Sequence, residues 1–136
     1  MQDNIIINKV EIVSRCLARV REEYEAAKEN FVTDYSRQDA SILNLQRAIQ
    51  ATIDIAAHIV RVKGLAAPKE AQDLFVALYE NKMISEKINL RMKKMVGFRN
   101  MAVHEYQKLD PNIVVNIIKR NLIDVETFIK EILNAK

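Results

Sequence analysis

Residues 4–34 read NIIINKVEIVSRCLARVREEYEAAKENFVTD, and their apolar residues repeat with the period of a helix. Spacings of four and three alternate through Ile6, Val10, Val13, Leu17, Val20, Tyr24, Ala27 and Phe31. This alternation keeps the apolar side chains on one side of an α-helix, in a seam that repeats about every 3.5 residues. The pattern predicts one amphipathic helix over residues 4–34. A helix this long needs a partner of similar length against which to bury its seam.

The next segment supplies that partner. Between residues 39 and 63 the apolar spacing is again three and four, through Ile42, Leu45, Ile49, Ile53, Ala56 and Val60. Gly64 suits the position just after the end of a helix, where the backbone often turns left-handed. Residues 35–38 are expected to form the turn. Two long helices joined by a short turn are expected to pack antiparallel.

Three further helices are expected in the second half of the chain. A short one is expected to start at Ala67–Pro68, with proline in its first turn, and to end near Tyr79. Ser85 is a candidate cap for a fourth helix, and Asp110–Pro111 is a cap and first-turn pair that opens the last one. Neither internal repeats nor the alternation typical of strands is present. The sequence therefore predicts an all-α, up-and-down bundle of four to five helices, a single domain over residues 1–136.

The composition limits the classes of protein to which this chain can belong. Only two glycines and two prolines occur in 136 residues, and 29% of the residues are charged, which favours a globular helical domain. The net charge of +3 permits a nucleic-acid partner without requiring one. Cys16 is a lone cysteine on the apolar face of the first helix, so a buried, reduced thiol is expected. No membrane span or signal peptide is predicted, and the expected location is the cytoplasm.

The residues with the most chemistry are the eight from Arg99 to Tyr106, RNMAVHEY. Arginine binds phosphate through a planar, bidentate guanidinium, and histidine exchanges a proton near neutral pH. Together with the phenol of Tyr106, Arg99 and His104 supply nearly everything that metal-free RNA cleavage requires. Each residue alone has a plainer interpretation: a surface cation paired with Glu105, a histidine near a helix end, and a tyrosine, Tyr106, that covers the edge of the core.

The spacing of Arg99 and His104 restricts how they can cooperate. Residues five apart lie about 140° from one another around an ideal helix. The two side chains therefore act together only if the helix ends or unwinds between them, or if two chains meet. Gly97 before the pair and residues 108–111 after it favour a helix that ends near His104.

The run from Val96 to Tyr106, VGFRNMAVHEY, resembles the Arg-x4-His-x-Tyr motif of HepT-type toxins, which are small helical ribonucleases of the HEPN superfamily. Residues 39–54, DASILNLQRAIQATID, followed by His58, are similar to the second helix of that family. The resemblance covers essentially the whole chain in length, helix order and both motifs.

The resemblance implies a HEPN fold, a symmetric homodimer, and metal-independent cleavage of RNA, either mRNA or tRNA, by Arg99 and His104 at the dimer cleft. It also implies a partner, the MNT nucleotidyltransferase antitoxin, which binds such toxins and can transfer AMP to the tyrosine of the motif, here Tyr106. No cofactor and no metal are expected. A non-catalytic helical dimer that docks a nucleotidyltransferase or binds a nucleotide is the alternative, and a purely structural subunit is a third interpretation.

A polar stripe accompanies the motif. Gln46, Gln50, Asp54 and His58 recur every four residues along the second expected helix. The plainer interpretation is a solvated face. In the other, the stripe lines the dimer cleft, and Asn44, Arg47 or Asp54 helps to orient the catalytic pair. Asn100, next to Arg99, is a further candidate supporting residue, and Lys93 and Lys94 are candidates for extending a phosphate-binding surface.

Overall fold

The computed structural model describes residues 3–135. Within that range the chain forms six α-helices and two short 3₁₀ helices, and no strand. The elements are α1 (Asn4–Ala27), η1 (Lys28–Asn30), α2 (Tyr35–Val62), α3 (Ala71–Glu80), α4 (Glu86–His104), η2 (Tyr106–Lys108), α5 (Pro111–Arg120) and α6 (Leu122–Asn134). The all-α architecture is therefore as predicted, with one or two more helices than expected. None of these helices is long and apolar enough to cross a membrane.

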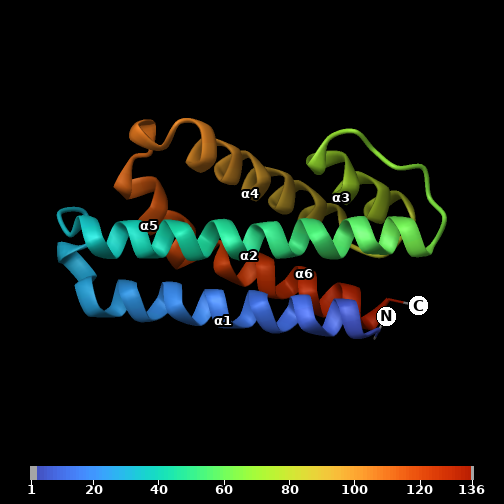
Figure 1. Cartoon of the computed structure of the whole chain (residues 1–136), viewed down its shortest axis with the longest axis horizontal. Coiled ribbons are helices and arrows are strands. Elements are labelled where there is room, and N and C mark those ends of the chain that lie inside the picture. Colours follow the sequence, from blue (N-terminus) through green and yellow to red (C-terminus); the bar gives the residue numbers. More distant parts are fainter. Residues whose placement is uncertain (1–2, 136) are drawn as a thin grey trace.

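The antiparallel pair of α1 and α2 is the frame of the bundle. The two helices run side by side and make the most extensive helix–helix contact in the described chain (Figure 1). Helices α3 and α4 lie along one side of α2, and α5 and α6 return across the bundle behind it (Figure 1). One apolar core joins all six helices, and Cys16 is buried in it as expected. Burial of this kind is the dominant favourable term in folding.

The turn between the first two helices lies earlier than the sequence predicted. Helix α1 ends at Ala27, because Lys28 adopts a positive φ of 46° that an α-helix does not accommodate. Asp34 caps α2 by accepting a hydrogen bond from the Arg37 amide (3.2 Å). Residues 35–38, expected to be the turn, are therefore the first turn of α2. Phe31 is nevertheless fully buried, so the buried apolar residues continue beyond the end of α1.

Two boundaries in the second half also differ from the prediction. Helix α3 begins at Ala71, so Pro68 lies in the connection before it and not in its first turn. The last helix is two helices, divided at Asn121 (φ −114°, ψ −9°), which is both the C-cap of α5 and the N-cap of α6. Its side-chain amide donates to Asp124 (2.9 Å), a buried carboxylate that also accepts from Arg91 (3.4 Å). These hydrogen bonds to Asp124 lie where α5 ends and α6 begins.

Three predicted helix ends are confirmed. Ser85 caps α4 by accepting from the Ile88 amide (3.2 Å), and Asp110 caps α5 ahead of Pro111. Gly64 (φ +68°) follows α2 with two reverse bonds, Gly64 N–H to the Arg61 carbonyl (3.2 Å) and Leu65 N–H to the Val60 carbonyl (2.9 Å). These bonds form a Schellman motif. The cap at Ser85 fixes the start of the helix that carries Arg99.

Candidate active site at the end of helix α4

Arg99 and His104 lie on the last turns of α4, which runs unbroken from Glu86 to His104. The helix ends at His104 as expected, and it does not unwind between the two residues. They nevertheless share one open pocket of about 300 Å³ between the end of α4 and the start of α3. We call it the helix-end pocket; its lining residues are Glu70, Ala71, Gln72, Val96, Arg99, Asn100 and His104. Both side chains are long enough to reach the helix-end pocket, although the two residues lie on different sides of the helix.

Arg99 is held by a chain of hydrogen bonds that crosses three helices. Its Nη1 donates to Oε1 of Gln50 on α2 (2.9 Å). Gln50 donates its own amide to Oδ1 of Asp54 (2.9 Å). Oδ2 of Asp54 accepts from Lys9 of α1 (2.9 Å). The guanidinium is thus oriented by a neutral amide and makes no ion pair with a carboxylate of residues 3–135, so its positive charge stays available to an anion.

The remaining side-chain nitrogens of Arg99 and the ring of His104 have no hydrogen-bond partner among residues 3–135. The Arg99 Nε is buried without a hydrogen bond. His104 is exposed, and its ring makes no hydrogen bond or ion pair with the described residues. The exposed imidazole is therefore accessible to a substrate. The pocket therefore combines a fixed cation with a proton carrier.

Tyr106 lies just beyond the pocket in η2, immediately after α4. Its hydroxyl donates to Oδ1 of Asp39, in the second turn of α2. Partial burial, together with the hydrogen bond to the Asp39 carboxylate, raises the pKa of Tyr106 to about 12. The phenol is therefore neutral throughout the physiological range, while 41% of the residue remains exposed.

The supporting residues predicted from the sequence lie in three different settings. Asp54 supports Arg99 indirectly, through Gln50, and Asn100 lines the helix-end pocket. Asn44 is buried and donates back to the Ala40 carbonyl one turn earlier (2.9 Å); the hydrogen bond of Arg99 goes to Gln50 instead. Arg47 is exposed and makes no ion pair among residues 3–135.

The polar stripe on α2 proved to be more than a solvated face. Gln50 and Asp54 belong to the hydrogen-bond chain that holds Arg99. His58 is buried and pairs through Nε2 with Asp3 (2.7 Å), at the far end of the helix pair. Sequence reasoning named the stripe but did not single out Gln50, and it missed Asp39 entirely. The four-residue repeat was the available signal for Gln50; no local signal marks Asp39.

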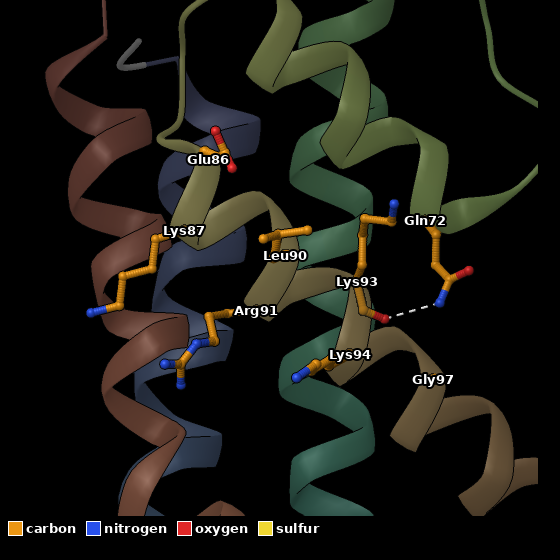
Figure 2. A pocket seen from close by; sticks show the side chains of 8 residues that line it. All are labelled: Gln72, Glu86, Lys87, Leu90, Arg91, Lys93, Lys94 and Gly97. Atoms are coloured by element: carbon orange, nitrogen blue, oxygen red, sulfur yellow. Dashed lines mark hydrogen bonds between the residues drawn. The ribbon is translucent and has the colours of Figure 1, made fainter.

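A second, larger depression adjoins the helix-end pocket along α4. It has a volume of about 660 Å³, and we call it the lysine groove. Its lining residues are Gln72, Glu86, Lys87, Leu90, Arg91, Lys93, Lys94 and Gly97 (Figure 2). Gln72 lines both depressions and donates to the Lys93 carbonyl (3.0 Å), the dashed line in Figure 2. Four cations and one carboxylate line this groove, which suits a polyanion.

No group of three His, Cys, Asp or Glu side chains within residues 3–135 lies close enough together to hold a metal ion. The ionisable side chains that line the helix-end pocket are those of Glu70, Arg99 and His104, and the phenol of Tyr106 follows in η2.

Comparison with known proteins agrees with this chemistry. The family model described as ribonuclease HepT-like matches residues 13–132. The chain is 43% identical over 127 residues to the mRNA nuclease HepT of Shewanella oneidensis, covering 93% of this chain and 95% of that protein. It is 24% identical to the tRNA nuclease HepT of Aphanizomenon flos-aquae, over 94% of this chain and 87% of that protein.

The solved structures give the same result. The fold superimposes with a TM-score of 0.92 on a tri-AMPylated Shewanella oneidensis HEPN toxin solved in complex with an MNT antitoxin. That alignment has 42% identity and covers 97% of this chain and 98% of the other. The match to a structure of a toxin–antitoxin with AMP-PNP is nearly as close, with a TM-score of 0.91. The resemblance first seen in residues 96–106 is thereby confirmed along the chain, which belongs to the ribonuclease HepT-like family.

Proposed function

We propose that this chain is the toxin of a HEPN/MNT toxin–antitoxin module: a metal-independent endoribonuclease that acts in the cytoplasm as a symmetric homodimer. The observation that carries the proposal is the helix-end pocket, which Arg99 and His104 both line. The relatives described as an mRNA nuclease and a tRNA nuclease support RNA as the substrate.

The chemistry follows from what RNA itself provides. The 2′-hydroxyl is the nucleophile, so the protein has to remove its proton, protonate the leaving 5′-oxygen and stabilise the charge that develops between them. His104 transfers protons, a contribution typically worth about 10²–10⁴-fold in rate. Arg99 binds the scissile phosphate and stabilises the negative charge of the transition state. The products carry 2′,3′-cyclic phosphate and 5′-hydroxyl ends.

The lysine groove extends this site along the substrate. It adjoins the helix-end pocket through Gln72 and presents Lys93 and Lys94, the pair singled out in the sequence. Contacts of this kind bind the phosphates of a strand without reading its sequence.

The antitoxin neutralises the toxin by modifying the tyrosine of the motif. The related toxin that superimposes on this chain is tri-AMPylated and bound to an MNT antitoxin. In this protein Tyr106 is the proposed acceptor, because it is the tyrosine of the motif, it follows His104 by two residues, and 41% of it is exposed. An adenylyl group there adds volume and negative charge where the substrate phosphate has to sit.

Mapping the ends of cleaved RNA tests the nuclease. The purified protein is incubated with total RNA in EDTA, and the products are sequenced by methods that distinguish cyclic phosphate from hydroxyl ends. Arg99→Ala and His104→Ala should each abolish cleavage and keep the helical circular dichroism of the wild type. Arg120→Ala, which removes an exposed arginine from α5, is the matched control and should cleave normally. Products with 3′-hydroxyl and 5′-phosphate ends would contradict the mechanism.

Mass spectrometry tests the acceptor. With the partner nucleotidyltransferase and ATP, the wild-type chain should gain mass in steps of AMP, and Tyr106→Phe should gain none. Tyr35→Phe, at a more exposed tyrosine of α2, is the control and should be modified like the wild type.

A further inference from the structure

We propose that Asp39 is the catalytic base of the modification reaction: it takes the proton of the Tyr106 hydroxyl as that oxygen receives an adenylyl group. The toxin would then carry part of the machinery for its own inactivation, and the partner would supply the nucleotide. This inference rests on the proposed function, in which Tyr106 is the acceptor.

The fold places the Asp39 carboxylate against the Tyr106 hydroxyl. Asp39 and Tyr106 are 67 residues apart in sequence, and the fold brings the start of α2 beside η2. The phenol is the donor and the carboxylate oxygen is the acceptor, so the proton already points at the group that would receive it. Both residues are exposed, so a partner enzyme can reach the hydroxyl without opening the bundle.

The acidity of the phenol provides the second argument. Burial and the Asp39 carboxylate raise the pKa of Tyr106 to about 12. Only about one molecule in 10⁵ would then hold a phenolate at pH 7. Transfer through a phenolate formed beforehand is correspondingly slow, whereas a base that takes the proton during bond formation avoids that intermediate. Protein kinases use an aspartate in this way on the hydroxyl of their substrates.

The step balances with a nucleoside triphosphate as co-substrate. A lone pair of the Tyr106 oxygen forms a bond to the α-phosphorus, and the bond from that phosphorus to the bridging oxygen of the β-phosphate breaks. Pyrophosphate leaves with the electron pair of the broken bond. The hydroxyl proton passes to the Asp39 carboxylate, which later releases it to solvent, and nothing is oxidised or reduced.

Asp39 is distinguished from other acids near the site by its partner. Among residues 3–135 it is the only charged side chain that shifts the pKa of Tyr106. Glu105, the immediate neighbour of Tyr106, is paired instead with Lys108 (2.9 Å). The proposal therefore assigns the role to one carboxylate and provides a matched control in Asp73, an exposed acid of α3 without a side-chain partner in the described chain.

The test measures the single-turnover rate of AMP transfer against pH, with saturating partner enzyme and ATP, for the full-length chain. Asp39→Asn keeps the size and an oxygen that can accept the hydrogen bond, so it removes the base and preserves the positioning. We expect a loss of about 10²-fold or more at pH 7. The remaining rate should climb about tenfold per pH unit, because the variant depends on phenolate. Asp39→Glu should recover part of the rate, and Asp73→Asn should behave like the wild type.

The possible outcomes distinguish a wrong base, Asp39, from a wrong acceptor, Tyr106. If Tyr106→Phe escapes modification and Asp39→Asn reacts at the wild-type rate with the wild-type pH profile, Asp39 is not the base and the present inference is overturned. A slow Asp39→Asn variant whose pH profile is unchanged, and which Glu does not rescue, would overturn it too. If Tyr106→Phe is modified like the wild type, the acceptor in the proposed function is wrong, and the inference falls with it.

Discussion

The Arg99 side chain is oriented before any substrate arrives. Its Nη1 is bound to Gln50 on a different helix, and Gln50 is itself held by Asp54. A long, flexible side chain normally loses rotamer freedom when it binds an anion, and prior fixation reduces that loss. The uncharged amide of Gln50 achieves this without competing for the positive charge.

Gln50→Ala should therefore lower kcat for RNA cleavage by about tenfold, as the loss of an outer-shell partner typically does. The helical content should stay unchanged, since Gln50 is exposed and its removal opens no cavity. Initial rates at saturating RNA measure the effect. Gln46→Ala, one turn earlier on the same stripe and without a bond to Arg99, serves as the control. Equal rates for the two variants would show that the Gln50 contact does not prepare Arg99.

The raised pKa of Tyr106 leads to a prediction about pH dependence. Its pKa of about 12 should be visible in the ring carbon shifts of selectively labelled tyrosine. Asp39→Asn should lower that pKa but leave it above 10, since burial is the larger cause of the shift. A folded pKa above the unfolded one means that this group's contribution to stability is complete below pH 10 and disappears between about pH 10 and 12. A Tyr106 resonance that titrates near 10 in both proteins would contradict the contact.

At the scale of the element, helix α4 does most to build the site. It is capped at Ser85, continues through Gly97 and ends at His104. Its last turns face the start of α3 and supply four residues of the helix-end pocket. Because the helix is continuous, its axis fixes how far Arg99 stands from His104.

The elements that the sequence located correctly are those with a local chemical signal. Ser85, Gly64 and Asp110–Pro111 each mark a boundary through their own side chain or backbone freedom. One signal of this kind was misleading, because Pro68 lies in the connection before α3 and not in its first turn. The other missed boundaries lack such a signal. Lys28 takes a positive φ without being glycine, and the break at Asn121 accompanies a buried Asp124 that also binds Arg91 from another helix.

The presence or absence of a local signal also explains which residues of the site could be predicted from the sequence. The pair Arg99 and His104 is readable because both residues lie in one short run. The bond from Arg99 to Gln50 spans 49 residues, and the one from Tyr106 to Asp39 spans 67. Contacts of that separation depend on how the helices pack, which a pattern of spacing along one helix does not specify.

The two glycines give opposite predictions for stability. Gly97 lies inside α4, and an added Cβ would meet only Gln72 Nε2 at 3.9 Å, an ordinary contact. Gly97→Ala should therefore stabilise the fold by about 0.5–1 kcal/mol. Gly64 sits at φ +68° in open space, so Gly64→Ala should cost about 1 kcal/mol through backbone strain alone.

Urea unfolding followed by circular dichroism checks both changes, at one protein concentration because association adds to apparent stability. The midpoint should rise for Gly97→Ala and fall for Gly64→Ala. If the two midpoints moved in the same direction, either the continuity of α4 or the Schellman turn after α2 would be wrong.

At the scale of the whole molecule, the proposed mechanism assigns both proton transfers to histidine, and one subunit supplies a single His104. Each chain contributes one His104 to the end of α4, whereas cleavage needs a base and an acid in the same cleft. Two exposed apolar side chains flank that histidine: Met101 is 42% exposed and Val103 is 53% exposed. A second copy related by a two-fold axis would cover such a surface and bring a second imidazole to the substrate.

Mixing subunits tests this requirement. Wild-type chains and an equal amount of His104→Ala chains, unfolded and refolded together, should pair at random if the protein is a dimer. About one quarter of the dimers would then hold two imidazoles. If both are needed, cleavage falls to about one quarter of that of the same total amount of wild-type chain; if each subunit works alone, it falls to about one half. Measured rates near one half, or a monomer in analytical ultracentrifugation, would show that the acid and the base come from within one chain.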